Sequence, residues 1–385
     1  MKALKTAVIG VGGMGQGHCR GLAKMEEMKL TAVVDNHRDT AAKVGKEFRV
    51  PFFTDHRALL KAGLCEAAIV VTPHPHHARP TMDCLNAGIH VLCEKPLTER
   101  ISTALEMVKL AKRKKLTLGV NFPLRVQPKN AKLIEIMKAG ILGKLYRAQL
   151  ILPEYRTQAY YNSGSWRATW KGEGGGVLLN QAPHMIDLFL QLTGSPVEVY
   201  GLNSRRVHDI EVENTAQALM KFPDGGFGYF YTSTFETAPG KRMELVGDRG
   251  KLIVEDNDVR FFLYEESLEK MTLDTDGVWQ QVKPKRVPFK LPKKAPPTIH
   301  QNFARHILYG EELICAGESG LLSLEFANAL ALSSEKGQWL KLPINPKAYD
   351  EFLLEKQRTS TFVKKKVREA RVTDPRTIAK SKPNL

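Results

Sequence analysis

Short apolar runs rich in β-branched residues alternate with amphipathic stretches through the first third of the chain. In one such stretch, residues 101–112, Ile101, Leu105 and Val108 recur at helical spacing on one side. Strands that alternate with helices in this way form a parallel sheet with helices on both faces. We therefore predict an α/β Rossmann domain over residues 1–123. Its expected strands are Thr6–Ile9, Leu30–Val34, Ala67–Thr72, His90–Cys93 and Thr117–Val120.

The pattern changes after Pro123. A helix is expected over Asn130–Ala139 and a long strand over Lys144–Leu152. Between residues 196 and 262, strand-like runs are separated by turn residues, which is typical of an antiparallel meander. Residues 124–350 are therefore predicted to form a second, α+β domain on a large, mostly antiparallel open sheet. Turns are expected at Pro223–Gly226 and Gly247–Gly250, a Lys/Pro-rich loop at Lys283–Pro297, and helices at Ile299–Tyr309 and Leu321–Lys336.

Composition narrows the class of protein. Apolar residues make up 43% of the chain and charged residues 25%, which is typical of a packed globular protein. No stretch approaches the roughly 18 apolar residues of a membrane span, and the strand Thr6–Ile9 begins too close to Met1 for a signal peptide. The five cysteines are scattered, so neither a disulfide framework nor a zinc site is expected. These features predict a cytoplasmic protein with no membrane partner.

Half of the net charge of +16 lies at the C-terminus. Residues 356–385 contain ten Lys or Arg against two Asp or Glu, a balance of +8. Such a segment is typical of a solvated, flexible extension that aids solubility. We therefore expect a basic tail over these residues and no nucleic-acid partner.

A glycine-rich turn directly follows the first expected strand. Its G-x-G-x-x-G spacing lies between a strand and a helix, where backbone N–H groups can approach a pyrophosphate at the positive end of the helix dipole. The turn therefore predicts binding of a dinucleotide. The expected contacts come from Gly10, Gly12, Gly13, Met14 and Gly15.

Asp35 ends the second expected strand, about twenty residues after the glycine turn. A carboxylate at this position accepts hydrogen bonds from the adenosine ribose hydroxyls and repels a 2′-phosphate. NAD is therefore preferred over NADP. Arg38 lies three residues further on and would accept a phosphate if Asp35 turned away.

Three further motifs accompany the glycine turn: Val71-Thr72-Pro73-His74 with His77, Ala87-Gly88 followed by Cys93-Glu94-Lys95-Pro96, and a Gly174–Asp187 segment that contains Asn180 and His184. Together they resemble the glucose-fructose oxidoreductase/inositol dehydrogenase family of two-domain NAD(P) enzymes. The resemblance extends over most of the chain, up to about Tyr349. It implies an NAD-dependent enzyme that acts on a sugar or cyclitol and forms a homodimer or homotetramer through the second domain's sheet.

Lys95 lies just after the strand His90–Cys93, at the carboxyl edge of the sheet, where ligands of open α/β folds bind. The resemblance implies that Lys95 hydrogen-bonds the reacting hydroxyl and that the Lys95–Pro96 bond is cis. An ammonium beside the substrate oxygen would stabilise a developing alkoxide. The resemblance also implies that the loops around this edge line the nicotinamide pocket. The further cofactor residues expected there are Thr72, Pro73, His74, His77 and Glu94.

His184 matches the family's general acid/base, and a histidine exchanges protons near neutral pH. Many relatives have Asp where this chain has Asn180, and an amide orients a neighbour but carries no compensating charge. Pro183 predicts that a helix begins nearby, so Asn180 is expected either to assist catalysis or to cap that helix. Asp187, one turn after His184, is expected to be structural.

Three further groups complete the expected site. Asn121 is expected either to contact the nicotinamide carboxamide or to stabilise a turn. His74, His76 and His77 lack nearby Cys or carboxylate ligands, so no metal site is expected. The loop Glu154–Trp170 is rich in aromatic residues and arginines, which pack on sugar rings and donate to hydroxyls. Its expected substrate contacts are Tyr155, Arg156, Trp166 and Arg167, together with Lys95, Asn180 and His184.

The sequence therefore predicts hydride transfer between NAD and a secondary alcohol of a sugar, sugar derivative or inositol. Lys95 is expected to act as the electrostatic stabiliser and His184 as the proton carrier. Two alternatives stay open: an NAD-dependent glycosidase that works by transient oxidation and elimination, and a regulator that senses NAD or sugar without turnover.

Overall fold

The apolar runs of the first third form the predicted parallel sheet. The computed structural model describes residues 3–368. The strands are β1 (Leu4–Ile9), β2 (Met28–Val34), β3 (Phe52–Phe53), β4 (Ala67–Val70), β5 (His90–Cys93) and β6 (Leu118–Val120). They are ordered β3-β2-β1-β4-β5-β6, and every pair is parallel. All four residues of β4 are buried, because both faces of the sheet are covered.

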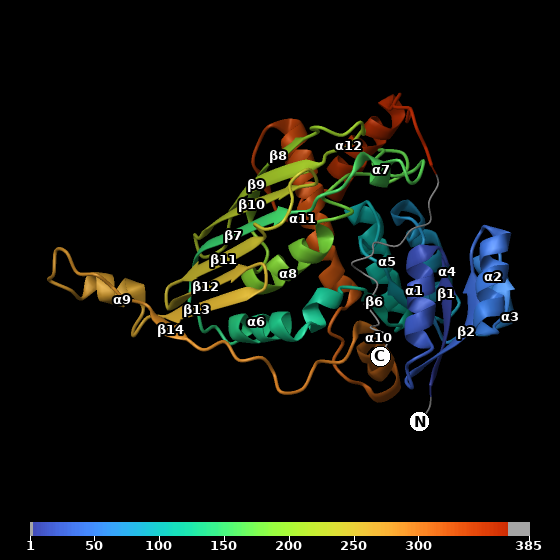
Figure 1. Cartoon of the computed structure of the whole chain (residues 1–385), viewed down its shortest axis with the longest axis horizontal. Coiled ribbons are helices and arrows are strands. Elements are labelled where there is room, and N and C mark those ends of the chain that lie inside the picture. The colour runs from blue at the N-terminus through green and yellow to red at the C-terminus, as the bar shows by residue number, and fades with distance from the viewer. Residues whose placement is uncertain (1–2, 369–385) are drawn as a thin grey trace, which may run out of the picture.

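Helices connect these strands and cover the sheet (Figure 1). The helix that follows the glycine turn begins at Gly13 and is separated from β1 by residues 10–12. The helices are α1 (Gly13–Leu22), α2 (Arg38–Phe48), α3 (His56–Ala62), α4 (Ala78–Asn86) and α5 (Ile101–Lys114), with short 3-10 helices η1 (His74–His76) and η2 (Pro123–Val126). The predicted Rossmann architecture is confirmed. The short β3 has no counterpart in the predicted strands, because two residues give no periodic pattern.

The second domain is built on a nine-stranded sheet. Its strands are β7 (Leu145–Pro153), β8 (Glu198–Ser204), β9 (Thr215–Lys221), β10 (Phe227–Ser233), β11 (Arg242–Gly247), β12 (Gly250–Glu255), β13 (Asp258–Leu263), β14 (Lys285–Val287) and β15 (Leu340–Lys341). Their order is β14-β13-β12-β11-β7-β10-β9-β8-β15. All pairs are antiparallel except β7 with β10. The sheet is thus mostly antiparallel, as predicted, but β7 inserts at its centre and interrupts the meander. β14 forms inside the segment expected to be only a loop.

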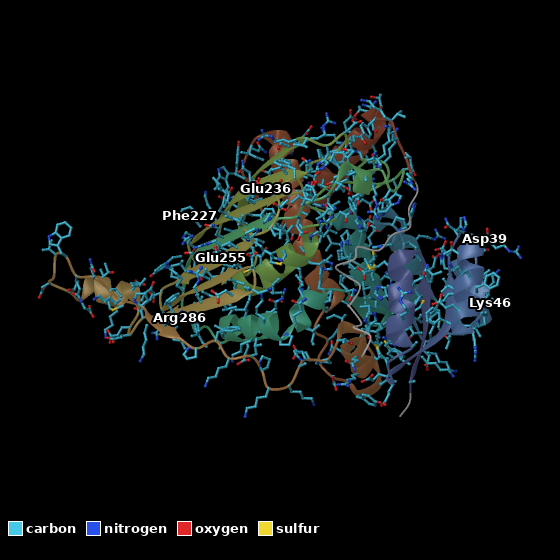
Figure 2. The ribbon with its side chains drawn as sticks, in the orientation of Figure 1. Asp39, Lys46, Phe227, Glu236, Glu255 and Arg286 are labelled. Atoms are coloured by element: carbon cyan, nitrogen blue, oxygen red, sulfur yellow. The ribbon has the colours of Figure 1, made fainter. Side chains whose placement is uncertain are left out.

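Seven helices belong to the rest of the described chain, and two of them cover one face of this sheet. The seven are α6 (Pro128–Lys138), α7 (Gln158–Tyr161), α8 (Pro183–Thr193), α9 (Leu268–Leu273), α10 (Ile299–Tyr309), α11 (Gly317–Lys336) and α12 (Pro346–Thr359). α8 and α11 pack on the sheet. Side chains alternate along β7, so that Ala148 and Leu150 are buried while Arg147 faces outward. On the opposite face Phe227 is 62% exposed and projects away from the sheet (Figure 2).

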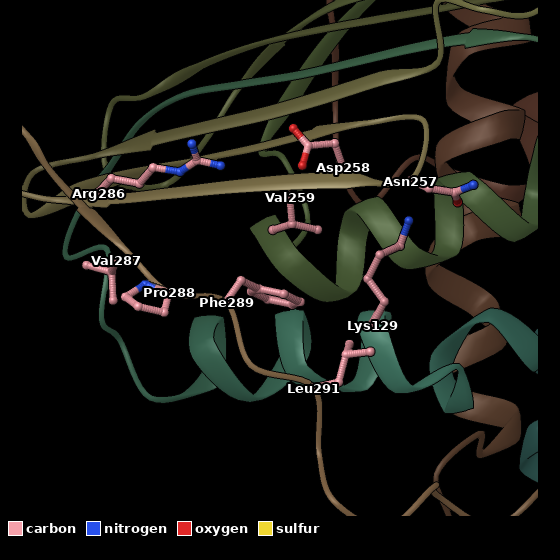
Figure 3. A pocket seen from close by; sticks show the side chains of 9 residues that line it. All are labelled: Lys129, Asn257, Asp258, Val259, Arg286, Val287, Pro288, Phe289 and Leu291. Atoms are coloured by element: carbon pink, nitrogen blue, oxygen red, sulfur yellow. The ribbon is translucent and has the colours of Figure 1, made fainter.

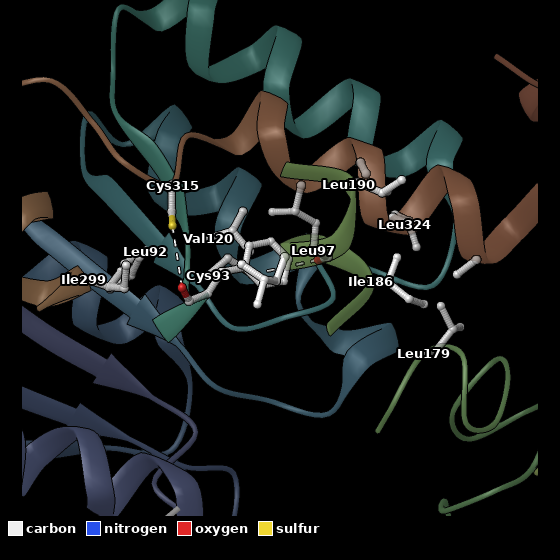
Figure 4. Packing of buried hydrophobic residues seen from close by; sticks show 14 of the residues in the cluster. Leu92, Cys93, Leu97, Val120, Leu179, Ile186, Leu190, Ile299, Cys315 and Leu324 are labelled. Carbon is white, nitrogen blue, oxygen red and sulfur yellow. Dashed lines mark hydrogen bonds between the residues drawn. The ribbon is translucent and has the colours of Figure 1, made fainter. Parts of the chain in front are cut away.

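One continuous hydrophobic core joins the two sheets. At the junction, Leu97 and Val120 of the first domain pack with Ile186 of α8 and Leu324 of α11 (Figure 4). The close approach of α11 requires a glycine, since a Cβ on Gly320 would lie 2.7 Å from Val120. The core therefore fixes the carboxyl edge of the first sheet against α8. The division at residue 123 stays a prediction, although β6 and β7 on its two sides belong to different sheets.

The chain returns to the first domain through α10. Arg305 on α10 forms an ion pair with Glu27 at 2.6 Å, and His300 contacts His18 of α1 at 2.8 Å. α10 thus packs against the nucleotide domain, although it falls in the range predicted for the second domain. This packing places part of the C-terminal half beside the helix that follows the glycine turn.

The expected basic tail begins inside α12. Residues 356–359 are helical, because Tyr349 and Leu353 anchor this amphipathic helix in the core. Further along, Lys364 donates hydrogen bonds to the carbonyl oxygens of Tyr161 and Gly164, both at 2.7 Å. Residues 356–359 of the predicted tail are therefore the end of a helix, the solvated extension stays a prediction, and residues 369–385 lie outside the described residues.

A buried ion pair links η2 to α8. Arg125 donates to the two carboxylate oxygens of Asp187 at 2.8 and 2.5 Å and also to the Ile314 carbonyl at 3.0 Å. Both side chains are almost fully buried. Asp187 therefore has the structural role expected for it and does not pair with His184.

We expect the Asp187→Asn variant to lose about 3–5 kcal/mol of unfolding free energy, because it leaves the Arg125 cation buried without a counter-charge. Urea denaturation measures this loss. Glu27→Gln is the matched control: it removes one partner of the more exposed Arg305 pair and should cost about 1 kcal/mol or less. Equal, small losses of unfolding free energy in both variants would contradict the structural role of the Arg125–Asp187 pair.

Candidate active site

The glycine turn has the geometry of a dinucleotide site. Gly10 has φ +93°, and a Cβ on it would lie 2.7 Å from the Val71 carbonyl oxygen. A Cβ on Gly15 would lie 1.9 Å from the Gly10 carbonyl oxygen. At Gly12, the residue that precedes α1, a Cβ would meet no atom within 4 Å, so open space lies at the positive end of the helix. These residues fit the pyrophosphate of NAD. Gly13 and Met14 open α1, and Met14 is 40% exposed.

Asp35 lies at the end of β2 beside this turn. Its carboxylate accepts hydrogen bonds from the Val11 N–H at 3.0 Å and from the His37 N–H at 2.9 Å. The two donors hold the carboxylate at the turn, and its expected repulsion of a 2′-phosphate stays a prediction. Arg38 is exposed at the start of α2.

Lys95 connects the first domain to the turn that carries Asn180 and His184. The Lys95–Pro96 bond is cis, as the resemblance implied. The Lys95 Nζ donates to the Asn180 carbonyl oxygen at 2.7 Å. Burial lowers the pKa of Lys95, while the carboxylates of Glu94 and Glu173 act in the opposite direction. Lys95 remains partly exposed, so its remaining N–H groups can reach a ligand.

His184 is the second residue of α8, after Pro183 at the first position. Burial lowers its pKa to about 3, and the Lys95 ammonium acts in the same direction. The imidazole is therefore neutral at pH 7 and can accept a proton. Its Nδ1 is buried and has no hydrogen-bond partner within residues 3–368.

The Asn180 side chain does not cap α8. The helix is preceded by Ala182, which makes no side-chain cap. The capping interpretation is therefore wrong, because the Asn180 amide turns toward the 157–173 loop instead. Its Nδ2 donates to Glu173, and its Oδ1 lies 3.4 Å from the Tyr160 hydroxyl.

Glu94 organises a buried polar cluster behind Lys95. Its Oε1 accepts from Asn121 Nδ2 at 2.5 Å and pairs with His18 Nε2 at 2.9 Å. Burial alone would raise the pKa of Glu94, but the His18 and Asn121 contacts lower it well below its usual range. Glu94 and Asn121, both predicted as cofactor contacts, therefore support each other. The sequence reasoning missed His18 and its partner His300, although His18 lies three residues after Gly15 on the buried side of α1.

The β4–η1 loop carries the other predicted cofactor residues. His77 is buried between the carbonyl oxygens of Thr72 and Pro96, at 2.6 and 2.8 Å, and so ties this loop to the Lys95 loop. The Thr72 hydroxyl donates to the His76 carbonyl at 2.8 Å, and Pro73 precedes η1. These contacts are structural. His74, by contrast, has a buried Nδ1 without a partner within residues 3–368, and its ring faces Trp166 at 6.2 Å.

The aromatic loop divides into two groups. Arg167 lies over the Trp166 and Tyr160 rings at 4.5 and 4.7 Å and donates to the Tyr160 hydroxyl at 3.0 Å. The guanidinium of Arg156 lies 5.3 Å from the same Tyr160 ring. These side chains join the Lys95–Asn180 cluster, whereas Tyr155 is 51% exposed and no described contact links its side chain to the cluster. Tyr160, not selected from the sequence as a substrate contact, is thus central.

Unpartnered polar atoms mark where a ligand fits. Of the seven buried side-chain atoms without a hydrogen-bond partner within residues 3–368, three belong to this cluster. They are His74 Nδ1, His184 Nδ1 and Gln181 Oε1. Gln181 also donates to the Tyr160 hydroxyl at 3.1 Å. Its position next to Asn180 was the only signal for it in the sequence.

Other features of the described chain lie apart from this cluster. A cavity of about 670 Å³ opens beside α6, β13 and β14 and shares no lining residue with it (Figure 3). Residues 3–368 contain no group of three or more His, Cys, Asp or Glu side chains placed to hold a metal ion. Within the same range, no helix has the length and apolar character needed to cross a membrane.

The Rossmann sheet, the glycine turn and the lysine at its carboxyl edge define a two-domain NAD-binding oxidoreductase. Residues 4–122 match the oxidoreductase family with the NAD-binding Rossmann fold, and residues 130–253 match the GFO/IDH/MocA C-terminal domain. The chain belongs to the GFO/IDH/MocA oxidoreductase family.

Curated relatives include dehydrogenases. The chain is 26% identical over 242 residues to trans-1,2-dihydrobenzene-1,2-diol dehydrogenase of Mus musculus, covering 62% of this chain and 70% of the relative. It is 21% identical over 349 residues to myo-inositol 2-dehydrogenase of Thermotoga maritima, covering 88% and 98%. These names agree with the class of enzyme that the site defines.

Solved structures share the fold over about nine tenths of this chain. The WlbA dehydrogenase of Chromobacterium violaceum, in complex with NADH and UDP-GlcNAcA, has a TM-score of 0.77 at 24% identity and covers 90% of this chain and 97% of its own. Levoglucosan dehydrogenase, in complex with NADH and levoglucosan, has a TM-score of 0.75 at 18% identity and covers 89% and 100%. At these identities the likeness shows the fold alone.

We expect Asp35→Asn to weaken NADH binding roughly ten- to hundredfold, because a charged hydrogen-bond acceptor contributes about 1.5–3 kcal/mol. The ratio of NADPH to NADH affinity should rise, since the repulsive charge is gone. Fluorescence titration measures both dissociation constants. Asp39→Asn, on the exposed side of α2 (Figure 2), is the control and should bind NADH like the parent. An unchanged constant for Asp35→Asn would place the ribose elsewhere.

Proposed function

We propose that this protein transfers a hydride between NAD and a secondary alcohol carbon of a sugar, sugar derivative or inositol. The observation that carries the proposal is the hydrogen bond from Lys95 Nζ to the Asn180 carbonyl. It joins the lysine at the edge of the nucleotide sheet to the turn that leads into His184. A catalytic site built from both domains follows from that contact.

The chain's own residues perform distinct tasks in this reaction. NAD, held by the glycine turn and Asp35, would supply the acceptor for the hydride of the alcohol carbon. The Lys95 ammonium donates a hydrogen bond to the reacting oxygen and stabilises the negative charge that develops there. His184, neutral at pH 7, accepts the hydroxyl proton. When a ketone is reduced, Lys95 still donates to the reacting oxygen, and the proton moves from His184 to that oxygen.

The surroundings of the cluster support a polyol substrate. The rings of Trp166 and Tyr160 offer apolar faces, while Arg167, Gln181 and His74 offer polar atoms at the same place. This combination suits a ring with alternating C–H faces and hydroxyls. The neighbouring structures that hold levoglucosan or UDP-GlcNAcA support the same class of substrate.

We expect Lys95→Ala and His184→Ala each to reduce kcat at least roughly hundredfold while NADH binding persists, because each removes a group that acts on the reacting oxygen. NADH absorbance with a sugar panel measures turnover. Lys46→Ala, on the exposed side of α2, is the control.

Accumulating NADH supports a dehydrogenase, whereas sugar release at constant NAD supports the glycosidase. Ligand-induced thermal stabilisation without turnover supports the regulator.

We also propose that the chain forms a homodimer or homotetramer through the outer face of the nine-stranded sheet. On that face Leu219 of β9 lies between Tyr200 of β8 and Tyr229 of β10 in register, and Leu202 and Phe227 are close by on the same strands. Leu202, Leu219 and Phe227 are 47%, 51% and 62% exposed. A cluster of exposed apolar side chains flanked by charged ones, such as Lys221 and Arg147 in register with Phe227, is self-complementary when two copies meet across a two-fold axis.

We expect the parent protein to sediment as a dimer or tetramer at micromolar concentration, and Leu219→Lys to shift it toward monomer, because burying a charge at the centre of the interface is costly. Analytical ultracentrifugation measures the mass. Leu354→Lys, at a similarly exposed leucine on α12, should leave the mass unchanged. A monomeric parent protein would contradict the proposal.

A further inference from the structure

Glu173 is a second buried carboxylate close to Lys95 and Asn180, and the reaction proposed above does not use it. Glu173 is 1% exposed and immediately precedes Gly174. One of its oxygens accepts from the Ala168 N–H at 2.6 Å, and the other accepts from the Asn180 side-chain amide. Burial raises the pKa of Glu173, whereas these two hydrogen bonds and the Arg167 and Lys95 charges favour its ionised form.

The contacts of Glu173 reach Lys95 through Asn180. The Asn180 backbone carbonyl accepts a hydrogen bond from the Lys95 ammonium at 2.7 Å, and the Asn180 side-chain amide donates to Glu173. The position of the Asn180 peptide, and with it the anchor of Lys95, therefore depends on the Glu173 carboxylate. The Tyr160 hydroxyl, 3.4 Å from Asn180 Oδ1, approaches the amide from its other side.

We propose that Glu173 is a positioning residue of the active site: its carboxylate holds Asn180 and, through Asn180, Lys95, and it provides the counter-charge for the Lys95 ammonium. The catalytic part of this inference rests on the proposed function. The structural part, that Glu173 acts on Lys95, does not depend on which substrate is turned over.

The charges around Lys95 explain why a counter-charge matters. Glu94 and Glu173 favour the protonated amine, whereas Arg156, Arg167 and burial disfavour it. The imidazoles of His74, His77 and His184 also face the amine, and burial lowers the pKa of each. Glu94 is already engaged with His18 and Asn121. Removing the Glu173 charge therefore lowers the pKa of Lys95 further, and the ammonium is lost at a lower pH.

The first test removes the charge and keeps the shape. We expect Glu173→Gln to reduce kcat/KM roughly ten- to hundredfold, since hydrogen bonds to charged groups contribute about 1.5–3 kcal/mol. The alkaline limb of the pH profile should move to lower pH, because Lys95 loses its proton earlier. Glu211→Gln is the matched control: Glu211 accepts from the Trp170 N–H at 2.8 Å in the same loop but does not contact Asn180. Its alkaline limb should stay in place.

The second test moves the charge. Asn180→Asp alone places two carboxylates against each other and should also impair turnover. The double variant Asn180→Asp with Glu173→Gln restores one carboxylate beside Lys95, so its kcat/KM should exceed that of either single variant. A double variant impaired by the sum of the single effects, or a Glu173→Gln variant with the parent pH profile, would overturn the proposal.

A direct titration separates this inference from the proposed function. Trace acetylation with peptide mass spectrometry reports the pKa of Lys95 without any substrate. In protein that still binds NADH, Glu173→Gln should lower that pKa relative to the parent, and an unchanged pKa would refute the role of Glu173. Absence of sugar oxidation by the parent would instead refute the proposed function and leave this result standing.

Discussion

The continuous core between the two domains is the constraint on which the site depends. Leu97 and Val120 at the edge of the first sheet pack with Ile186 on α8 and Leu324 on α11. A close-packed interior transmits position from one element to the next. The edge that carries Lys95 and the helix that carries His184 are therefore held together by apolar contacts. The hydrogen bond from Lys95 to the Asn180 carbonyl then orients the lysine side chain.

Buried charge gives the site its chemistry. Glu94 and Glu173 are buried and Lys95 is partly buried, and a charge taken out of bulk water is unstable unless it is paired. Each therefore needs neighbours that favour its ionised form, and the structure provides them from α1, from the β6 edge and from the 157–182 loop. Burial lowers the pKa of His184 and the Lys95 ammonium acts in the same direction, so the imidazole is kept neutral. The same partly buried site thus holds an ammonium and a neutral imidazole.

Local patterns predicted much of the fold. The β-branched runs and the glycine turn at Gly10–Gly15 identified the parallel sheet and the NAD-binding end of α1, because strand burial and backbone approach to a pyrophosphate depend on neighbouring residues. Pro183 correctly indicated a helix start. The position of β7 between β10 and β11 was not predictable, since strand pairing at long range leaves no periodic signal in either strand.

By itself the sequence determined the class of domain, the NAD motif and the presence of Lys95 and His184 in recognisable contexts, because each of these is encoded in residues close along the chain. Only the tertiary structure decided how the polar side chains are used. It directed Asn180 toward Glu173 rather than the α8 N-terminus, paired Glu94 with His18, and brought α10 back to the first domain. Such choices depend on which distant partner satisfies a buried polar atom, and that is settled by packing in three dimensions.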